Sequence, residues 1–266
     1  MKSLKILAGM NGRVSLVAGG SGHLGIAMGE ALAEAGSNVI VLDLDKERSE
    51  SVASQFIEKF GGEHKGLAVD LAEKEAISTV PQYIKKHFGK LDVLVNCAAL
   101  VGSSSLKGWA TPFKEQDIDT WEKAIKVNLT GAFFLIQQCQ DLMEKSKVAS
   151  IVNVSSIYGV AGQKVSMYQG MDYLTPAAYA ASKGGLVQLT RYLATVLAPK
   201  IRVNCISPGG IERNQDKVFT ERYRNLTPLM RMGIEEDFKG VTHFLASDLS
   251  AYVTGQNIIV DGGWTL

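Results

Sequence analysis

A tyrosine and a lysine four positions apart could perform acid–base chemistry in this chain. Tyr179 and Lys183 lie in a run from Ala177 to Ala198 that we expect to be helical. Positions i and i+4 share one face of a helix, so the phenol and the ammonium would point the same way. A nearby cation stabilises a phenolate and should lower the tyrosine pKa from its reference of about 10. The pair would then be suited to proton transfer near neutral pH.

Two further polar side chains could act with this pair. Ser156 follows an apolar run at 150–155 that predicts a buried strand, so its hydroxyl would face the ligand crevice at the carboxyl edge of a parallel sheet. Asn128 lies in a long, largely apolar run at 120–144 that predicts a helix. An asparagine side chain in such a helix needs a polar partner. The alternative to a partner elsewhere in the fold is a hydrogen bond from the side chain to the nearby backbone. Asn128, Ser156, Tyr179 and Lys183 are therefore the candidate catalytic residues.

A glycine cluster from Gly19 to Gly25 leaves a predicted strand and enters a predicted helix. Glycines let the backbone turn tightly and approach a pyrophosphate, while the helix N-terminus offers free N–H groups and a positive dipole end. The alternative is a tight turn without a ligand. The cluster favours a dinucleotide site.

Two carboxylates follow later strands and would face the adenosine half of such a ligand. Asp43 ends the second strand, 24 residues after Gly19, and could accept hydrogen bonds from both ribose hydroxyls of NAD. It would repel the extra phosphate of NADP, and no Lys or Arg lies in the glycine loop or directly after Asp43, so NAD is predicted over NADP. Asp70 ends the third strand and could meet the adenine amine, or it could cap the helix beginning at Ala72.

These residues need a framework, and the alternation of β-branched and amphipathic runs supplies one. Strands are predicted at 14–18, 38–43, 66–70, 92–97, 150–155, 201–206 and 257–260. Helices are predicted at 23–35, 73–88, 120–144, 177–198 and 235–247. The pattern predicts a single domain over 1–266, an α/β three-layer Rossmann-like fold with a doubly wound parallel sheet of about seven strands. Residues 1–11 would form a surface arm, 159–176 an irregular stretch, and 208–233 a mobile substrate loop.

Composition excludes several other classes of function. The net charge is +1, so no nucleic-acid partner is expected. No apolar run reaches the ~20 residues that span a bilayer, and no membrane partner is predicted. The three cysteines lack CxxC spacing, which indicates reduced thiols in the cytoplasm, and no metal site is predicted.

The chain resembles the short-chain dehydrogenase/reductase family over nearly its whole length. The matching segments are Gly19–Gly25, Asn96–Ala99, Asn128, Ser156-x-x-Gly159, Tyr179-x-x-x-Lys183, Arg202–Gly209 and Val253–Gly263. The resemblance implies that Ser156 polarises the substrate oxygen, Tyr179 exchanges the proton, Lys183 binds the nicotinamide ribose, and Asn128 holds a water. Further cofactor contacts would be Ser21, Gly22, His23, Leu24, Leu71, Asn96, Ala98, Pro208, Gly209 and Ile211.

The resemblance also implies a homotetramer or homodimer, in keeping with apolar residues at 133–136 that exceed one helix face. The chain departs from the family pattern at three places. Ala18 replaces the usual Thr, His23 replaces the middle glycine, and Cys97 and Ala99 alter the usual Asn-Asn-Ala-Gly. We expect His23 to pack locally or to touch phosphate.

Two polar loops predict the class of substrate. The interval from Ser156 to Tyr179 is 23 positions, longer than is common in the family, and the loop is polar and aromatic. Arg213, Lys217, Arg222 and Arg224 follow Pro208 and suit an anionic group. These features predict a sugar-like substrate, and they resemble a bacterial subset associated with flagellin modification and nonulosonic-acid sugar synthesis. The alternatives are a 3-oxoacyl-thioester reductase, a non-catalytic NAD-binding member and a Rossmann-like methyltransferase.

Overall fold

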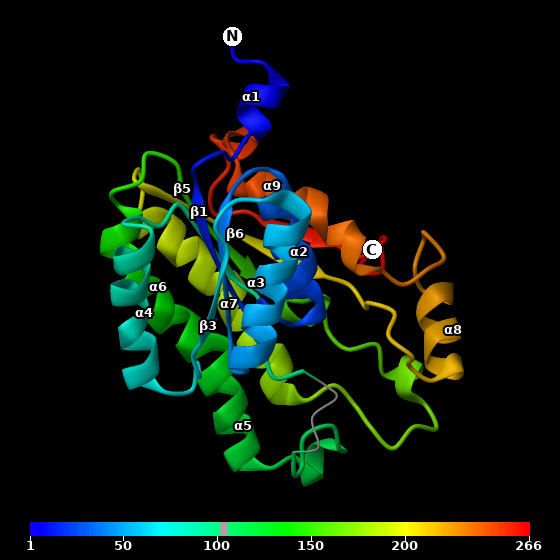
Figure 1. The fold of residues 1–266 in the computed structure, drawn as a ribbon. Coiled ribbons are helices and arrows are strands. Elements are labelled where there is room, and N and C mark those ends of the chain that lie inside the picture. Colours follow the sequence, from blue (N-terminus) through cyan, green and yellow to red (C-terminus); the bar gives the residue numbers. More distant parts are fainter. Residues whose placement is uncertain (102–105) are drawn as a thin grey trace.

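A parallel β-sheet forms the centre of the molecule in the computed structural model, which describes residues 1–101 and 106–266 (Figure 1). Among these residues the sheet has seven strands in the order β3-β2-β1-β4-β5-β6-β7. The strands are β1 (Val14–Ala18), β2 (Asn38–Asp43), β3 (Lys65–Ala68), β4 (Val93–Asn96), β5 (Ala149–Val154), β6 (Ile201–Pro208) and β7 (Asn257–Val260). The predicted single-domain, doubly wound fold is confirmed.

The strand order reverses beside β1. From β1 the chain moves outward to β2 and β3, and then returns to place β4 on the other side of β1. In register, Leu16 of β1 lies between Ile40 of β2 and Leu94 of β4. Ligands of open α/β sheets bind at such a switch point, outside the carboxyl ends of the strands. The candidate residues should therefore gather at that edge.

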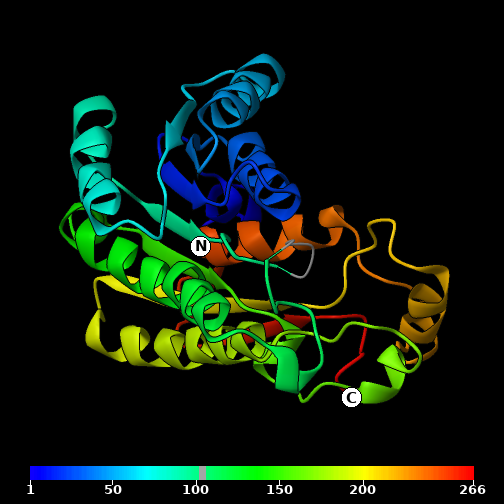
Figure 2. The ribbon, with the colours of Figure 1, turned by 90° about the horizontal axis from the view of Figure 1, so that it is seen from below.

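Helices cover both faces of the sheet (Figure 2). They are α1 (Leu4–Ala8), α2 (His23–Glu34), α3 (Lys46–Phe60), α4 (Lys74–His87), α5 (Ile118–Ile125), α6 (Ala132–Met143), α7 (Ala177–Val196), α8 (Lys217–Asn225) and α9 (Lys239–Ala246). One apolar core joins α4, α6 and α7 to the sheet, and a second joins α2, α3 and α9 to its other face. Strands β1, β4 and β5 are buried along their whole length, as their continuous apolar sequences predict.

Several element boundaries differ from the prediction. The helix expected at 120–144 is interrupted by a π-helical turn, η2 (Lys126–Gly131). Strand β3 ends at Ala68, before Asp70. The helix expected at 235–247 begins as a 3₁₀ turn, η5 (Glu235–Phe238). The segments expected to be irregular contain helix α8 and a 3₁₀ turn, η4 (Val165–Tyr168).

The expected N-terminal arm contains the short helix α1, which has no buried residue, whereas Met10 near its end is buried in the apolar core. His243 Nε2 lies 2.6 Å from Ala8 O and joins the arm to α9. In the described parts of the chain, no helix is both long enough and apolar enough to cross a membrane.

Candidate active site

The turn from β1 into α2 is held by close contacts between backbones. Gly19 has φ +76°, and a Cβ there would lie 2.5 Å from Ala98 N. A Cβ on Gly25 would overlap Gly19 O. Gly22 begins α2 without a side-chain cap, so the first helical N–H groups have no side-chain acceptor. Open N–H groups at the start of a 12-residue helix fit a pyrophosphate.

The Asp43 carboxylate lies beside this turn at the end of β2. Its Oδ2 accepts from Ser21 N at 3.0 Å, and its Oδ1 accepts from Leu44 N at 2.8 Å. Asp43 is partly exposed and Leu44 is exposed, so the carboxylate stands at the open edge where a ribose would lie. The hydrogen bond from Ser21 N thus ties the glycine turn to the end of β2.

Asp70 and Leu71 lie in the turn between β3 and α4. Asp70 Oδ1 accepts from Ala72 N at 2.7 Å, but α4 begins later and has Glu73 as its N-cap residue. The alternative of Asp70 as the helix cap is therefore wrong in detail, because its carboxylate closes the turn before the helix. The Leu71 side chain is buried in the core.

The other predicted cofactor positions surround the same edge. Asn96 Nδ2 donates to Asn153 Oδ1 at 2.8 Å and links β4 to β5. Pro208 ends β6, and Gly209 N donates to Val260 O at 2.9 Å. Ile211 forms a parallel bridge with Gly233, which closes the base of the long loop between them. Leu24 is partly buried against the core, whereas His23 is exposed.

Close backbone packing at Gly159 brings α7, the helix that carries Tyr179 and Lys183, next to Ser156. A Cβ on Gly159 would lie 2.8 Å from the backbone carbon of Lys183, so only glycine lets α7 pack against this turn. Ser155 Oγ donates to Lys183 O at 2.7 Å and fixes the same contact. Ser156 Oγ accepts from Tyr158 N at 3.2 Å, and Ser156 interacts with the Tyr179 phenol. The predicted triad of Ser156, Tyr179 and Lys183 therefore lies together.

The expected pKa shift of Tyr179 is wrong in sign. Burial raises the pKa of Tyr179, and the hydrogen bond from Ser156 and the charge of Arg213 oppose this rise without overcoming it. Lys183 does not reverse the shift because its Nζ donates to Val154 O at 2.7 Å and lies 5.6 Å from the tyrosine ring centroid. Burial also lowers the pKa of Lys183 to about 8. At neutral pH the phenol therefore carries its proton and is a proton donor.

Asn128 lies in the π-helical turn, a kind of irregularity that is frequent at functional sites. Its Oδ1 accepts from Leu100 N at 2.7 Å, and its Nδ2 donates to Ser182 Oγ at 3.1 Å. Ser182 Oγ donates in turn to Tyr179 O at 2.8 Å. The partners of the Asn128 side chain are therefore distant in sequence, and through Ser182 the side chain links η2 to the backbone of α7.

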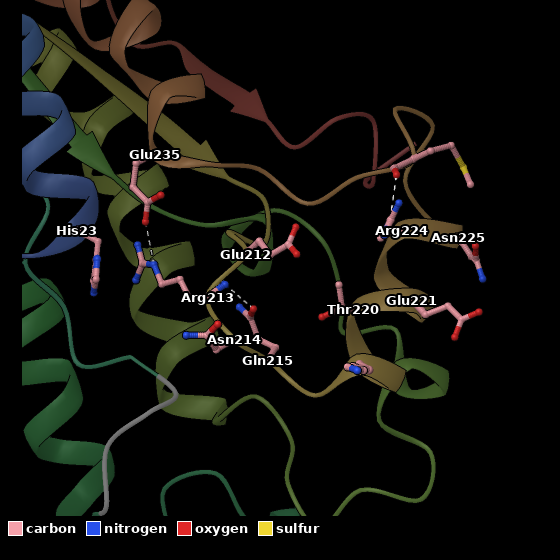
Figure 3. A pocket seen from close by; sticks show the side chains of 12 residues that line it. His23, Glu212, Arg213, Asn214, Gln215, Thr220, Glu221, Arg224, Asn225 and Glu235 are labelled. Atoms are coloured by element: carbon pink, nitrogen blue, oxygen red, sulfur yellow. Dashed lines mark hydrogen bonds and ion pairs between the residues drawn. The ribbon is translucent and has the colours of Figure 1, made fainter.

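A polar cavity of about 1080 Å³ lies against this edge (Figure 3). His23 lines one wall, and the loop after β6 lines the other. The lining from that loop includes Glu212, Arg213, Asn214, Gln215 and Lys217, with Thr220, Glu221, Arg224, Asn225 and Met230 beyond them. Glu235 of η5 completes the wall, and Arg213 Nε lies 3.1 Å from its Oε1.

Arg222 does not serve the cavity, contrary to the expectation that it could bind an anion. Its Nη1 donates to Met167 O at 3.0 Å and to Gln169 O at 2.7 Å. The guanidinium therefore ties α8 to the loop at 160–175, which lies beside it in Figure 2. The two segments predicted to cover the substrate are joined to each other.

Two side chains at this edge escaped the sequence-based prediction. Glu235 gave no signal because an acidic residue at a helix start is ordinary. Tyr223 accepts from Gly210 N at 2.6 Å through its hydroxyl and stacks on Trp264, with ring centroids 5.9 Å apart. The only sequence signal for these contacts of Tyr223 was its position as an aromatic residue in a polar loop.

Comparison with known proteins identifies the family. A sequence profile described as "Enoyl-(Acyl carrier protein) reductase" matches residues 19–265. The chain belongs to the short-chain dehydrogenase/reductase family and is an NAD(P)-dependent oxidoreductase acting on CH–OH and keto groups. This assignment excludes the methyltransferase alternative.

Relatives within the family differ in substrate and cofactor. The 3-oxoacyl-[acyl-carrier-protein] reductase FabG of Aquifex aeolicus is 34% identical over 259 residues, covering 96% of this chain and 98% of the relative. A gluconate 5-dehydrogenase from Burkholderia cenocepacia, solved with NADP and tartrate, has a TM-score of 0.88 and 27% identity over 99% of both chains. An NAD⁺-bound xylitol dehydrogenase has a TM-score of 0.83 and 30% identity, covering 95% of this chain and 99% of that one.

Proposed function

We propose that this protein interconverts a secondary alcohol and a ketone on a polar, sugar-like substrate and prefers NAD to NADP. The observation that carries the proposal is the cavity between His23 and the loop after β6, whose lining side chains are polar or charged except for Met230. A long apolar acyl chain would leave these groups without partners, at about 1–3 kcal/mol for each one buried. A hydroxylated substrate would satisfy them.

The catalytic roles follow from the protonation states and contacts of the triad. The nicotinamide supplies or accepts the hydride. In the direction of reduction, Tyr179 gives its proton to the substrate oxygen, and the Ser156 hydroxyl donates a hydrogen bond to the same oxygen. Lys183 would bind the nicotinamide ribose from its buried position, and Asn128 would hold the water of the proton path. A member that had lost catalysis would have no need of this arrangement.

The preference for NAD rests on Asp43. The carboxylate lies at the end of β2, and the next two residues are Leu44 and Asp45, neither of which is a cation. An adenosine 2′-phosphate placed there would meet negative charge with no arginine to offset it. The relatives include proteins solved with either cofactor, so the charge around Asp43 is the feature that favours NAD.

The polar lining of the cavity also favours an enzyme acting on sugars over the nearest alternative, a 3-oxoacyl-thioester reductase. Lys217 lines the cavity, and the structure gives it no ion pair within the described residues, so it is available to an anionic substrate group. We extend the proposal to the subset associated with flagellin modification and nonulosonic-acid sugars, acting as a cytoplasmic homotetramer or homodimer. Phe133 supports assembly because 41% of this apolar residue is exposed on α6.

The test combines cofactor binding with a substrate panel. Dissociation constants for NAD(H) should be at least about tenfold lower than for NADP(H), a difference of ~1.4 kcal/mol. Sugars and polyols should turn over faster than oxoacyl thioesters. Tyr179→Phe should keep the fold and the cofactor affinity and lose about 10²–10⁴-fold in kcat. Equal cofactor affinities, faster thioester turnover, or near-native activity of Tyr179→Phe would each reject the corresponding part.

A further inference from the structure

An ion pair lies in the lining of the cavity, on the side of His23 (Figure 3). Arg213 is the second residue after the bridge between Ile211 and Gly233, and its Nε lies 3.1 Å from Glu235 Oε1. The two side chains are 36% and 27% exposed. An ion pair this exposed contributes only about 0–1 kcal/mol, so a better anion can displace the carboxylate at small cost.

Arg213 also lies close to both halves of the proposed dinucleotide site. Figure 3 shows its guanidinium on the side of the cavity that faces His23, at the start of α2. Its positive charge also acts to lower the pKa values of the Tyr179 phenol and the Cys97 thiol, against the larger effect of burial. The guanidinium therefore shares a cavity with the first residue of α2, the helix whose N-terminus has no side-chain cap.

We propose that Arg213 breaks its ion pair with Glu235 and binds the pyrophosphate of the dinucleotide instead. The Glu235 carboxylate and the pyrophosphate then compete for the guanidinium. This inference rests on the proposed function, because it requires a dinucleotide along the glycine turn. A guanidinium matches the geometry of phosphate oxygens, and bonds to an ionised phosphate are stronger than neutral ones. Arg213 would then serve the cofactor rather than an anionic substrate group.

The matched control is Arg224, which lines the same cavity and carries the same charge. Its Nε donates to Met230 O at 3.3 Å, so it is tied to its own loop. Arg224→Gln removes one positive charge from the cavity without touching the proposed exchange. Any general effect of cavity charge on an anionic cofactor should appear equally in Arg224→Gln and Arg213→Gln.

The experiment measures the Kd of NADH by fluorescence, without substrate, for the wild type and four variants. Arg213→Gln should weaken binding about tenfold or more and flatten the dependence of Kd on salt. Glu235→Gln should tighten binding by up to about fivefold. The double variant should match Arg213→Gln, and Arg224→Gln should match the wild type.

Three outcomes would overturn the proposal. The first is equal weakening of binding by Arg213→Gln and Arg224→Gln, and the second is weaker binding in Glu235→Gln. The third is an unchanged Kd in Arg213→Gln with a raised KM for an anionic substrate. Failure of the wild type to bind either NADH or NADPH would instead reject the proposed function. Thermal unfolding of each variant checks that a loss of affinity is not a loss of fold.

Discussion

Two regions meet at the carboxyl edge of the sheet, and they are held in place in different ways. The first, which we call the catalytic floor, comprises the glycine turn at 19–25, the turn at 156–159 and the candidate catalytic residues Tyr179 and Lys183 of α7. Backbone packs directly on backbone there: Gly25 on Gly19, and Gly159 on Lys183. Such contacts leave no room for an added carbon atom.

The second region, the substrate rim, comprises residues 160–175 and 211–233. Side chains hold it together. Arg222 donates to two carbonyl groups of the opposite loop, and the Tyr168 hydroxyl lies 2.7 Å from that of Tyr158 and 2.8 Å from Thr175 Oγ1. Contacts of this kind can be exchanged for others without moving the sheet.

The difference explains how one fold can carry many specificities. The family includes relatives named for acyl-carrier-protein substrates and relatives named for gluconate. A floor fixed by glycines preserves the hydride and proton geometry, while a rim built from side chains can be replaced around it. The following predictions test whether the floor is rigid and whether the rim can be changed without affecting the floor.

The largest effect is expected at Gly25. Gly25→Ala would place a Cβ on Gly19 O, so the turn must shift, and we expect a loss of about 4 kcal/mol or more in the free energy of unfolding. The control is Gly240→Ala in α9, where a Cβ meets nothing within 4 Å and should stabilise by about 0.5–1 kcal/mol. Urea unfolding of both variants measures the contrast, and similar stabilities would refute the rigid floor.

A pH-dependent effect is expected from Lys183. Its pKa is lowered from 10.5 to about 8 in the folded protein, so between these values the unfolded chain binds more protons. The free energy of unfolding should therefore rise with pH from about 8 to about 10.5, by about 3 kcal/mol from this group. Lys183→Met should lack that rise. Parallel pH profiles of the two proteins would show that Lys183 is not in a low-dielectric floor.

The smallest effect is expected in the rim. Arg222→Ala removes two hydrogen bonds between loops and should cost about 1 kcal/mol in stability. We expect the KM for the substrate to rise several-fold while the Kd of NADH stays unchanged. Arg191→Ala is the control, because Arg191 is exposed on α7 and bonds only to Gln188 among the described residues. A large fall in kcat for Arg222→Ala would mean that rim and floor are not separable.

Much of the fold and the floor was determined by the sequence itself. Strands β1, β2 and β7 have the predicted bounds because their apolar runs end at polar or glycine residues. The spacing of Tyr179 and Lys183 fixes one helix face whatever surrounds it. The glycine turn is equally local, because only glycine fits its close backbone contacts.

Only the tertiary structure decided the pKa direction of Tyr179 and the partners of the arginines. A pKa depends on the water that neighbours exclude, and these neighbours come from distant segments, so spacing alone gave the wrong sign for Tyr179. Arg213 pairs with a residue 22 positions away, and Arg222 with one 55 positions away. Local sequence specifies turns and periodicity, whereas charge partners are chosen by whichever segments the folded chain brings together.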